Sequence, residues 1–259
     1  MTTSPSDINE LLLCAASAGA AADVSALLAR GADPRHLNSA SLFLAAKQGN
    51  AECVKLLIPH ANPKADSSNA LRWAASYGHA ECVKLLIPVS DPKASSSRAL
   101  RLAASKGAIE CLRLLIPVSD PAANASAALR LAADEGHLEC VKLLIPFSDL
   151  AAANYHALRI AIENDHIECA NLLIEPCSLL LNPQPFHAAV ACGDAKAVAF
   201  MLAREPALID LVNPAKLIID ADGNGHPRLA SLLLSIIESR AISSATSSTP
   251  SARSASTRL

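Results

Sequence analysis

Aromatic side chains are scarce in this chain of 259 residues, which holds a single Trp, two Tyr and four Phe. A globular domain of this length usually fills its centre with aromatic rings, because each ring buries a large area. Apolar residues nevertheless make up 51% of the sequence, so the chain can bury a core. A core of Ala, Leu, Ile, Val and Cys predicts a thin structure of closely spaced helices.

The chain also has no large excess of charge of either sign, since it contains 22 basic and 24 acidic residues and its net charge is −2. A weak electrostatic field argues against DNA, RNA or an anionic membrane as a partner. The shortage of rings also weakens any hypothesis of base stacking. We therefore expect no nucleic-acid partner and no membrane partner.

No segment is convincing as an export signal or a membrane span. Residues 11–29 are rich in Leu and Ala, but Asp7 and Glu10 stand where a signal peptide carries basic residues. Asp23 interrupts the stretch, which is also too short to span a bilayer. We expect a cytoplasmic protein whose eight Cys lie in a reducing compartment.

The sequence is dominated by an internal repeat of 29 residues. The segment Glu-Cys-Val-Lys-Leu-Leu-Ile-Pro at 52–59 returns at 81–88 and 139–146, and with two changes at 110–117. Two series of residues follow the same period: Cys53, Cys82, Cys111, Cys140 and Cys169, and Leu42, Leu71, Leu100, Leu129 and Leu158. A fixed period of this length is the signature of a repeat architecture.

The first half of each period predicts a short helix. In the unit that starts at residue 68, Ser68 or Asn69 can cap the helix. Leu71 and the Ala pair at 74–75 share one face at helical spacing, and Gly78 ends the helix because Gly tolerates a left-handed turn.

A second helix is predicted from Ala80 to Ile87, where Pro88 ends it. This helix is apolar nearly all round except for a stripe with Glu81 and Lys84. Such a helix must be packed on several sides. A linear stack of units buries these faces, which no single unit could do.

The unit resembles the ankyrin repeat. The resemblance is carried by Ala-Leu-Arg-Trp-Ala-Ala at 70–75, by Gly78-His79, and by Val-Lys-Leu-Leu at 83–86. Arg-Gly-Ala-Asp-Pro at 30–34 matches the family's usual ending. The family's fold is a helix-turn-helix solenoid, so the resemblance implies an all-α protein.

The pattern can be followed for about eight units over residues 8–240, the last of them a cap. Their anchor residues are Leu12, Leu42, Leu71, Leu100, Leu129, Leu158, Phe186 and Ile218, and their turn residues are Gly19, Gly49, Gly78, Gly107, Gly136, Asp165, Gly193 and Gly225. We expect a flexible segment at 1–7. Residues 241–259 contain ten Ser or Thr and predict a disordered tail.

Two departures from the family pattern affect the expected loops. The usual period is 33 residues, and the four missing ones fall where ankyrin repeats form a projecting β-hairpin. We therefore expect shortened hairpin loops in place of long fingers. The Ala-Leu-Arg start is similar to a subclass found in bacterial and giant-virus ankyrin proteins.

The cysteine series suggests a metal site or disulfides, but one Cys per unit fits neither. Adjacent helices lie roughly 8–10 Å apart, whereas a disulfide requires Cα atoms within about 7 Å. We interpret these Cys as core residues. The recurring His79, His137, His166 and His226 are likewise expected to be structural. No phosphate loop, nucleophile elbow or zinc-protease motif occurs, so we expect no cofactor, no metal and no enzyme activity.

A series of Arg residues leaves two interpretations open: Arg72, Arg101, Arg130 and Arg159. In the structural one, each Arg pairs with a loop acid such as Asp91, Asp120 or Asp149. In the functional one, the series offers bidentate donors to an acidic partner. The regular repetition favours the structural interpretation.

The resemblance places the two residues before each turn on the concave face of the stack, and these positions vary from unit to unit. The candidate partner-binding residues are Lys47, Gln48, Ser76, Tyr77, Lys106, Asp134, Glu135, Glu163 and Asn164. They run from basic to acidic with Tyr77 as the single aromatic, which is a typical interface anchor. The alternative is that exposed positions drift freely.

These observations predict a monomeric scaffold that binds a protein partner through its concave first-helix face. The alternative is a secreted bacterial effector that uses the ankyrin stack to target a protein inside a host cell.

Overall fold

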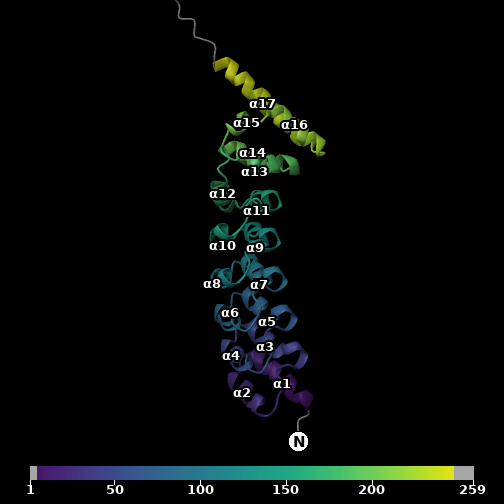
Figure 1. The fold of residues 1–259 in the computed structure, drawn as a ribbon, viewed down its shortest axis with the longest axis vertical. Coiled ribbons are helices and arrows are strands. Elements are labelled where there is room, and N and C mark those ends of the chain that lie inside the picture. The colour runs from purple at the N-terminus through teal and green to yellow at the C-terminus, as the bar shows by residue number, and fades with distance from the viewer. Residues whose placement is uncertain (1–4, 248–259) are drawn as a thin grey trace, which may run out of the picture. The chain divides into compact units, whose positions relative to one another are not determined.

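The computed structural model describes residues 5–247, with side chains for 7–242. By its contacts the chain divides into two compact units, Met1–Pro176 and Cys177–Leu259. Over the described residues every regular element is helical, and no strand is present (Figure 1). The prediction of an all-α protein is confirmed, and short turns stand where long ankyrin repeats carry a hairpin.

The first unit is a stack of six helix pairs. The first helices of the pairs are α1 (Pro5–Ala18), α3 (His36–Gln48), α5 (Ala65–Ser76), α7 (Ala94–Ser105), α9 (Ala123–Asp134) and α11 (Ala152–Glu163). The second helices are α2 (Ala21–Ala29), α4 (Ala51–Leu57), α6 (Ala80–Leu86), α8 (Ile109–Leu115), α10 (Leu138–Leu144) and α12 (Ile167–Ile174). Consecutive first helices pack on one another, and so do consecutive second helices, so the unit has two parallel rows (Figure 1).

The core lies between these rows and follows the repeat. The leucine anchors from Leu12 to Leu158 are at most 3% exposed, and the five cysteines of the series at most 2%. The Ala pair of each first helix from α1 to α9 is also buried, as at Ala74 and Ala75, and in α11 the buried pair is Ala161 and Ile162. Small side chains at these positions let neighbouring first helices approach closely, which explains why so few rings are needed.

A glycine in the left-handed conformation ends most first helices, as predicted, and a histidine of the next unit lies against several of them. Gly107 has a φ of 66°, and a Cβ built there would lie 2.8 Å from Nδ1 of His137. Nε2 of the same ring lies 3.1 Å from the carbonyl oxygen of Ser105. Because a carbonyl only accepts, Nε2 donates, and His137 satisfies a free carbonyl at the end of the preceding first helix.

The same contact recurs along the stack. His79 donates to the carbonyl of Lys47, and His166 to that of Asp134. At the end of α1 the capping residue is Asn50 of the next unit, whose Nδ2 donates to the carbonyls of Ala16 and Ser17. The structural role is therefore confirmed for His79, His137 and His166, each of which caps the first helix of the preceding unit, while the ring of His226 lies against Gly193.

Each first helix from α3 to α11 begins with a turn that the sequence did not predict. Three consecutive residues adopt left-handed angles, for example Ser95, Ser96 and Ser97 with φ of 52°, 56° and 55°. In α3, α5, α7 and α9 the last of them is a buried Ser, whose hydroxyl accepts a hydrogen bond from the next unit. Oγ of Ser68 accepts from the backbone N–H of Asp91 at 2.8 Å. The predicted cap by Ser68 or Asn69 was therefore wrong, because the helix has no side-chain cap, the Ser68 hydroxyl links two units, and Oδ1 of Asn69 accepts from Arg72.

The second unit contains two further helix pairs joined by the short α15 (Leu208–Leu211). The pairs are α13 (Gln184–Cys192) with α14 (Ala195–Arg204), and α16 (Pro214–Gly223) with α17 (Pro227–Ser247). Leu217 and Ala221 are buried on α16, whereas the predicted anchor Ile218 is only half-buried. The register differs by one residue because Asn213 caps the helix and fixes its start.

The helices reach further than the expected ends of the repeat domain. α1 begins at Pro5, inside the segment expected to be flexible, since a proline is well accommodated in the first turn of a helix. α17 continues to Ser247, beyond the expected start of the tail at 241. The tail residues 248–259 lie outside the described part of the chain.

Candidate partner-binding face

The candidate residues lie at the carboxyl ends of consecutive first helices of the first unit. We call the exposed surface of α1, α3, α5, α7, α9 and α11 the first-helix face. Lys47, Ser76, Asp134 and Glu163 lie in the last turns of their helices, while Tyr77, Lys106, Glu135 and Asn164 are the residues that follow, and Gln48 ends α3. All nine are exposed or half-buried. Because the first helices pack side by side, the candidate residues form a continuous strip.

The acidic end of the strip is ordered by hydrogen bonds between units. Nδ2 of Asn164 donates to Oδ1 of Asp134 at 2.8 Å and to its backbone carbonyl at 3.0 Å. Asp134 is thereby held toward α11, which leaves Glu135 exposed beside it.

An aromatic cluster, formed by Phe43, Trp73 and Tyr77, lies at the other end of the strip. The rings of Trp73 and Tyr77 are stacked with centroids 5.7 Å apart, and Phe43 meets Trp73 edge-on at 6.3 Å. Nζ of Lys47 lies 5.6 Å from the Trp73 ring centre, a cation–π contact. Trp73 and Tyr77 are 36% and 53% exposed. The prediction that Tyr77 is the single aromatic on this face was therefore wrong.

A signal for Trp73 was present in the sequence. The equivalent positions of other units hold Leu44, Leu102, Leu131 and Ile160, so an apolar residue there looked like core. All four are only half-buried in the structure. A Trp at a position that is elsewhere aliphatic is the exception that identifies the cluster.

The charges at the helix ends differ in their effect on the helices that carry them. A helix carboxyl end has a partial negative charge, which favours cations and disfavours anions. Lys47 and Lys106 match this preference at the ends of α3 and α7. Asp134 and Glu135 oppose it at the end of α9. The acidic residues therefore do not stabilise their own helix through its dipole.

Three members of the arginine series, Arg101, Arg130 and Arg159, donate to carbonyls of the left-handed turns, whereas Arg72 donates to Oδ1 of Asn69. Nε of Arg101 donates to the carbonyl of Ser96 at 3.1 Å and an η nitrogen to that of Ser95 at 3.0 Å. Arg130 makes the same two bonds to Ala125 and Asn124. The structural role is therefore supported, but with backbone carbonyls in place of the expected acids.

The loop acids expected to pair with these arginines have another role. Oδ1 of Asp91 accepts from the backbone N–H of Lys93, and Oδ1 of Asp120 from that of Ala122. Asp149 repeats the arrangement with Ala151. Each acid thus folds its own loop as an Asx turn. The predicted Arg–Asp pairing was wrong because it considered charge alone.

The cysteine series lies in the core as free thiols. Burial, with smaller contributions from neighbouring groups such as Glu81 and Glu110, raises the pKa of Cys82 and Cys111 to about 11. Both thiols are therefore protonated near neutral pH and poor nucleophiles. Cys14, by contrast, is exposed on α1.

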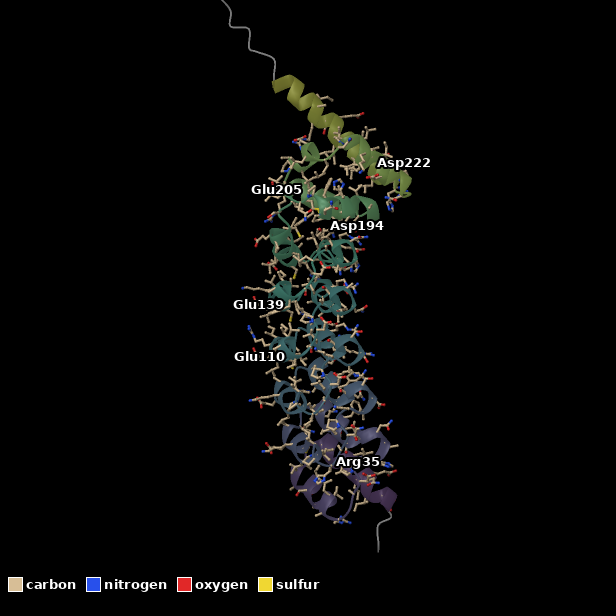
Figure 2. The ribbon with its side chains drawn as sticks, in the orientation of Figure 1. Arg35, Glu110, Glu139, Asp194, Glu205 and Asp222 are labelled. Carbon is tan, nitrogen blue, oxygen red and sulfur yellow. The ribbon has the colours of Figure 1, made fainter. Side chains whose placement is uncertain are left out.

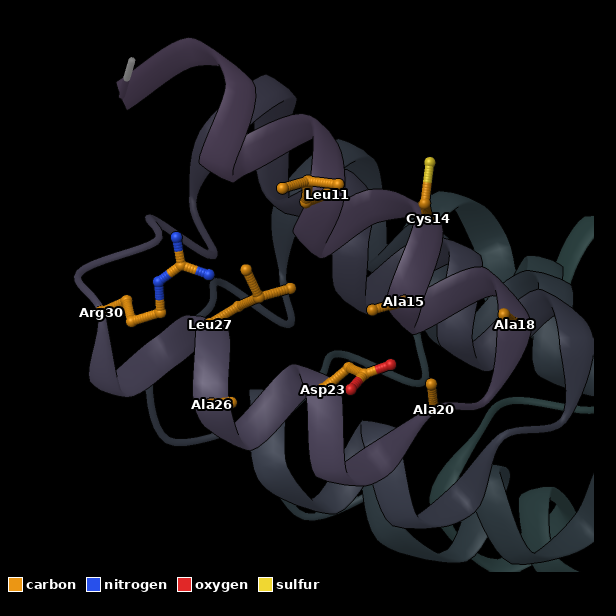
Figure 3. A pocket seen from close by; sticks show the side chains of 9 residues that line it. All are labelled: Leu11, Cys14, Ala15, Ala18, Ala20, Asp23, Ala26, Leu27 and Arg30. Carbon is orange, nitrogen blue, oxygen red and sulfur yellow. The ribbon is translucent and has the colours of Figure 1, made fainter. Parts of the chain in front are cut away.

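Two other surfaces of the first unit lie away from the candidate residues. A hollow of about 430 Å³ opens between α1 and α2, with Leu11 and Cys14 on one side and Asp23 and Arg30 on the other (Figure 3). The row of second helices carries charged side chains that project outward, such as Glu110 and Glu139 (Figure 2). None of the nine candidate residues lines the hollow.

The fold and the two rows of helices define a helical solenoid built from stacked pairs. The family model described as ankyrin repeats (3 copies) matches residues 11–97 and 100–184. The chain belongs to the ankyrin-repeat family, whose members generally mediate protein–protein interaction. No curated protein matches the chain. Among the described residues, no helix is long and apolar enough to cross a membrane.

Proposed function

We propose that the protein is a non-enzymatic scaffold that binds a protein partner through the first-helix face. The observation that carries the proposal is a contrast within the repeat. The contacts between units recur with the 29-residue period, whereas the exposed ends of the first helices differ from one unit to the next. The scaffold requires the recurring residues and leaves the variable ones available for recognition.

The aromatic cluster supports the proposal. Trp73 and Tyr77 expose stacked rings to solvent in a chain that has few rings at all. Aromatic residues are the commonest residues of strong contribution in interfaces, because they bury much area at a small entropic cost. A partner would cover these rings, and their mutual stacking holds them in place before it binds.

The acidic end supports the proposal as well. Asp134 and Glu135 stand where the helix dipole disfavours them, so the stability of the scaffold does not explain their presence. Complementary charge on a partner would explain it, since charge patterns set orientation and association rate. The partner would place an apolar group on the aromatic cluster and a basic group near Glu135, at the carboxyl end of α9.

A comparison of two triple-alanine variants tests the proposal. The first changes Lys47, Tyr77 and Glu135 on the first-helix face. The control changes Lys55, Glu81 and Phe147, which have the same chemical types but lie on the second helices or their loops. Phe147 and Tyr77 are both 53% exposed, which makes the two sets closely matched.

Affinity capture followed by mass spectrometry is the measurement, with circular dichroism to establish that both variants fold. We expect a protein captured by the wild type to be lost with the first variant and retained with the control. Equal capture by all three, or loss with the control alone, would refute binding through the first-helix face.

A further inference from the structure

A small pocket of about 190 Å³ lies on the first-helix face over α9, away from the aromatic cluster. It is lined from three consecutive units, with Arg101 from α7, Arg130 from α9 and His156 from α11. Ala127 and Asn124 of α9 also line it. Side chains that can donate hydrogen bonds therefore converge on one opening.

The pocket exists because one unit has a small residue at a position where its neighbours have large ones. The residues equivalent to Ala127 are Asn69 in α5, Arg98 in α7 and His156 in α11. Ala127 has no side chain beyond Cβ, so a space remains between Arg101, Arg130 and His156. Ala40 in α3 is equally small, but Leu13 and Phe43 stand there in place of the two arginines, so that position lacks the two guanidinium groups.

The two guanidinium groups are fixed in position but not fully used. Each donates from Nε and one η nitrogen to carbonyls of its own left-handed turn. A guanidinium has five N–H donors, so further donors remain on both groups. Among the described residues, no carboxylate lies within ion-pairing distance of Arg101 or Arg130. Their charge is therefore not neutralised by the scaffold.

The one acid on the rim does not fill the pocket. Asp134 is one turn after Arg130 on α9, but Oδ1 of Asp134 accepts from Asn164. Burial first of all lowers the pKa of Arg101, and the like charges of the neighbouring Arg98 and Arg130 lower it further. An anion placed between the two arginines would relieve this repulsion.

We propose that this pocket binds an oxyanion, a carboxylate or phosphoryl group carried by a side chain of the protein partner. Guanidinium groups with fixed orientation bind such groups through two parallel N–H···O bonds. The volume of about 190 Å³ has room for one such group. This inference deepens the proposed function, because the partner's backbone would then cross the first-helix face above Ala127.

The pocket is tested on the full chain with small anions, so the test does not depend on finding the partner. Inorganic phosphate and succinate are titrated while the side-chain Nε–H signals of Arg101 and Arg130 are followed by NMR, with ionic strength held constant by sodium chloride. The blocking variant is Ala127→Leu, which fills the space and retains both arginines. The matched control is Ala40→Leu, at the equivalent position of the second unit.

We expect saturable shifts of both signals in the wild type and in Ala40→Leu, and a loss of at least tenfold in affinity in Ala127→Leu. Stronger binding of phosphate would indicate a phosphorylated partner segment, and stronger binding of succinate an acidic one. No saturable shift with either anion, or equal affinity in Ala127→Leu, would overturn the proposal that this pocket binds an oxyanion. Partner capture through Tyr77 would be unaffected by that failure, so the two proposals can fail separately.

Discussion

Oγ of Ser97 accepts a hydrogen bond from the backbone N–H of Asp120 at 2.9 Å, although the two residues are 23 positions apart. Equivalent bonds join Ser39 to Asn62, Ser68 to Asp91 and Ser126 to Asp149. The four hydroxyls are nearly fully buried. Each hydroxyl therefore links the left-handed turn of its own unit to the loop of the next unit through one hydrogen bond.

Replacing Ser97 by Ala removes this acceptor and leaves the N–H of Asp120 without a partner in the protein. Asp120 is exposed and its N–H can bind water, so the free energy of unfolding should fall by the net value of one hydrogen bond, about 0.5–1.5 kcal/mol. Ser96→Ala is the control, because that side chain is exposed in the same turn. Urea unfolding gives the energies, and hydrogen exchange at the Asp120 amide shows the site. Equal effects of the two substitutions would mean that the hydroxyl does not link the units.

Two glycines separate backbone strain from side-chain crowding. Gly107 and Gly78 have φ of 66° and 77°, but a Cβ at Gly107 would meet Nδ1 of His137 at 2.8 Å, whereas at Gly78 the nearest atom is Cβ of Ala108 at 3.8 Å. Both alanine substitutions should cost about 1–2 kcal/mol for the left-handed conformation. Gly107→Ala should cost about 1 kcal/mol more, because it displaces His137 from its hydrogen bond with Ser105.

The additional loss of stability predicted for Gly107→Ala over Gly78→Ala is tested by urea unfolding of a protein that also lacks the His137 ring. In a His137→Ala protein, Gly107→Ala should cost no more than Gly78→Ala does in the wild type. An unchanged excess in that background would show that the histidine is not its cause.

Glu135 should weaken the helix that carries it. Glu135→Lys places a cation at the carboxyl end of α9 and should raise the free energy of unfolding by about 0.3–1 kcal/mol at low salt. Lys106→Glu at the end of α7 is the reciprocal control and should lower it by a similar amount. Thermal unfolding at two salt concentrations measures both effects. A loss of stability in Glu135→Lys would show that the acid supports the scaffold.

Buried thiols make the stability depend on alkaline pH. The ordinary thiol pKa is 9.0, and burial first of all raises the pKa of Cys82 and Cys111 to about 11. Between these values the unfolded chain has lost protons that the folded chain retains. The free energy of unfolding should therefore fall as pH rises from about 9 to about 11. Urea unfolding of the wild type and of a Cys82→Ala/Cys111→Ala protein measures the slope, which should be smaller in the variant.

The same burial predicts the order in which the thiols react. At pH 8 a thiol reagent should label Cys14 in the folded protein and reach the cysteine series only on unfolding. Rapid labelling of Cys111 in the folded state would contradict its place in the core.

The core could be predicted from the sequence because burial imposes the same demand on every unit. Leu100 and Cys111 recur with the period since each fills a space bounded by equivalent neighbours. The left-handed turn at Ser95–Ser97 could not be predicted, because it is held by the folded side chain of Arg101 and by a bond from Asp120 that forms only when the next unit is stacked. Local propensity favours a simple cap there, which is why the cap at Ser68 was expected.

The candidate face was predictable in position but not in detail. The strip could be identified because the residues before each turn glycine differ from unit to unit, as residues that recognise a partner are expected to do. The stacking of Trp73 on Tyr77 depends on two side chains one turn apart, and the aliphatic residues of other units concealed it. The pocket over Ala127 arises from a missing side chain, which a search for chemical groups in the sequence does not detect.

A photoreactive benzoylphenylalanine placed at Tyr77 or at Phe147 tests the central claim most directly, because both positions hold equally exposed aromatic residues in the wild type. Cross-links are formed in cells that contain the partner and are compared between the two proteins. Binding through the first-helix face predicts a discrete cross-linked species from position 77, lost when Lys47 and Glu135 are also changed to Ala, and none from position 147. The same species from position 147 alone, or from both positions in equal yield, would contradict it.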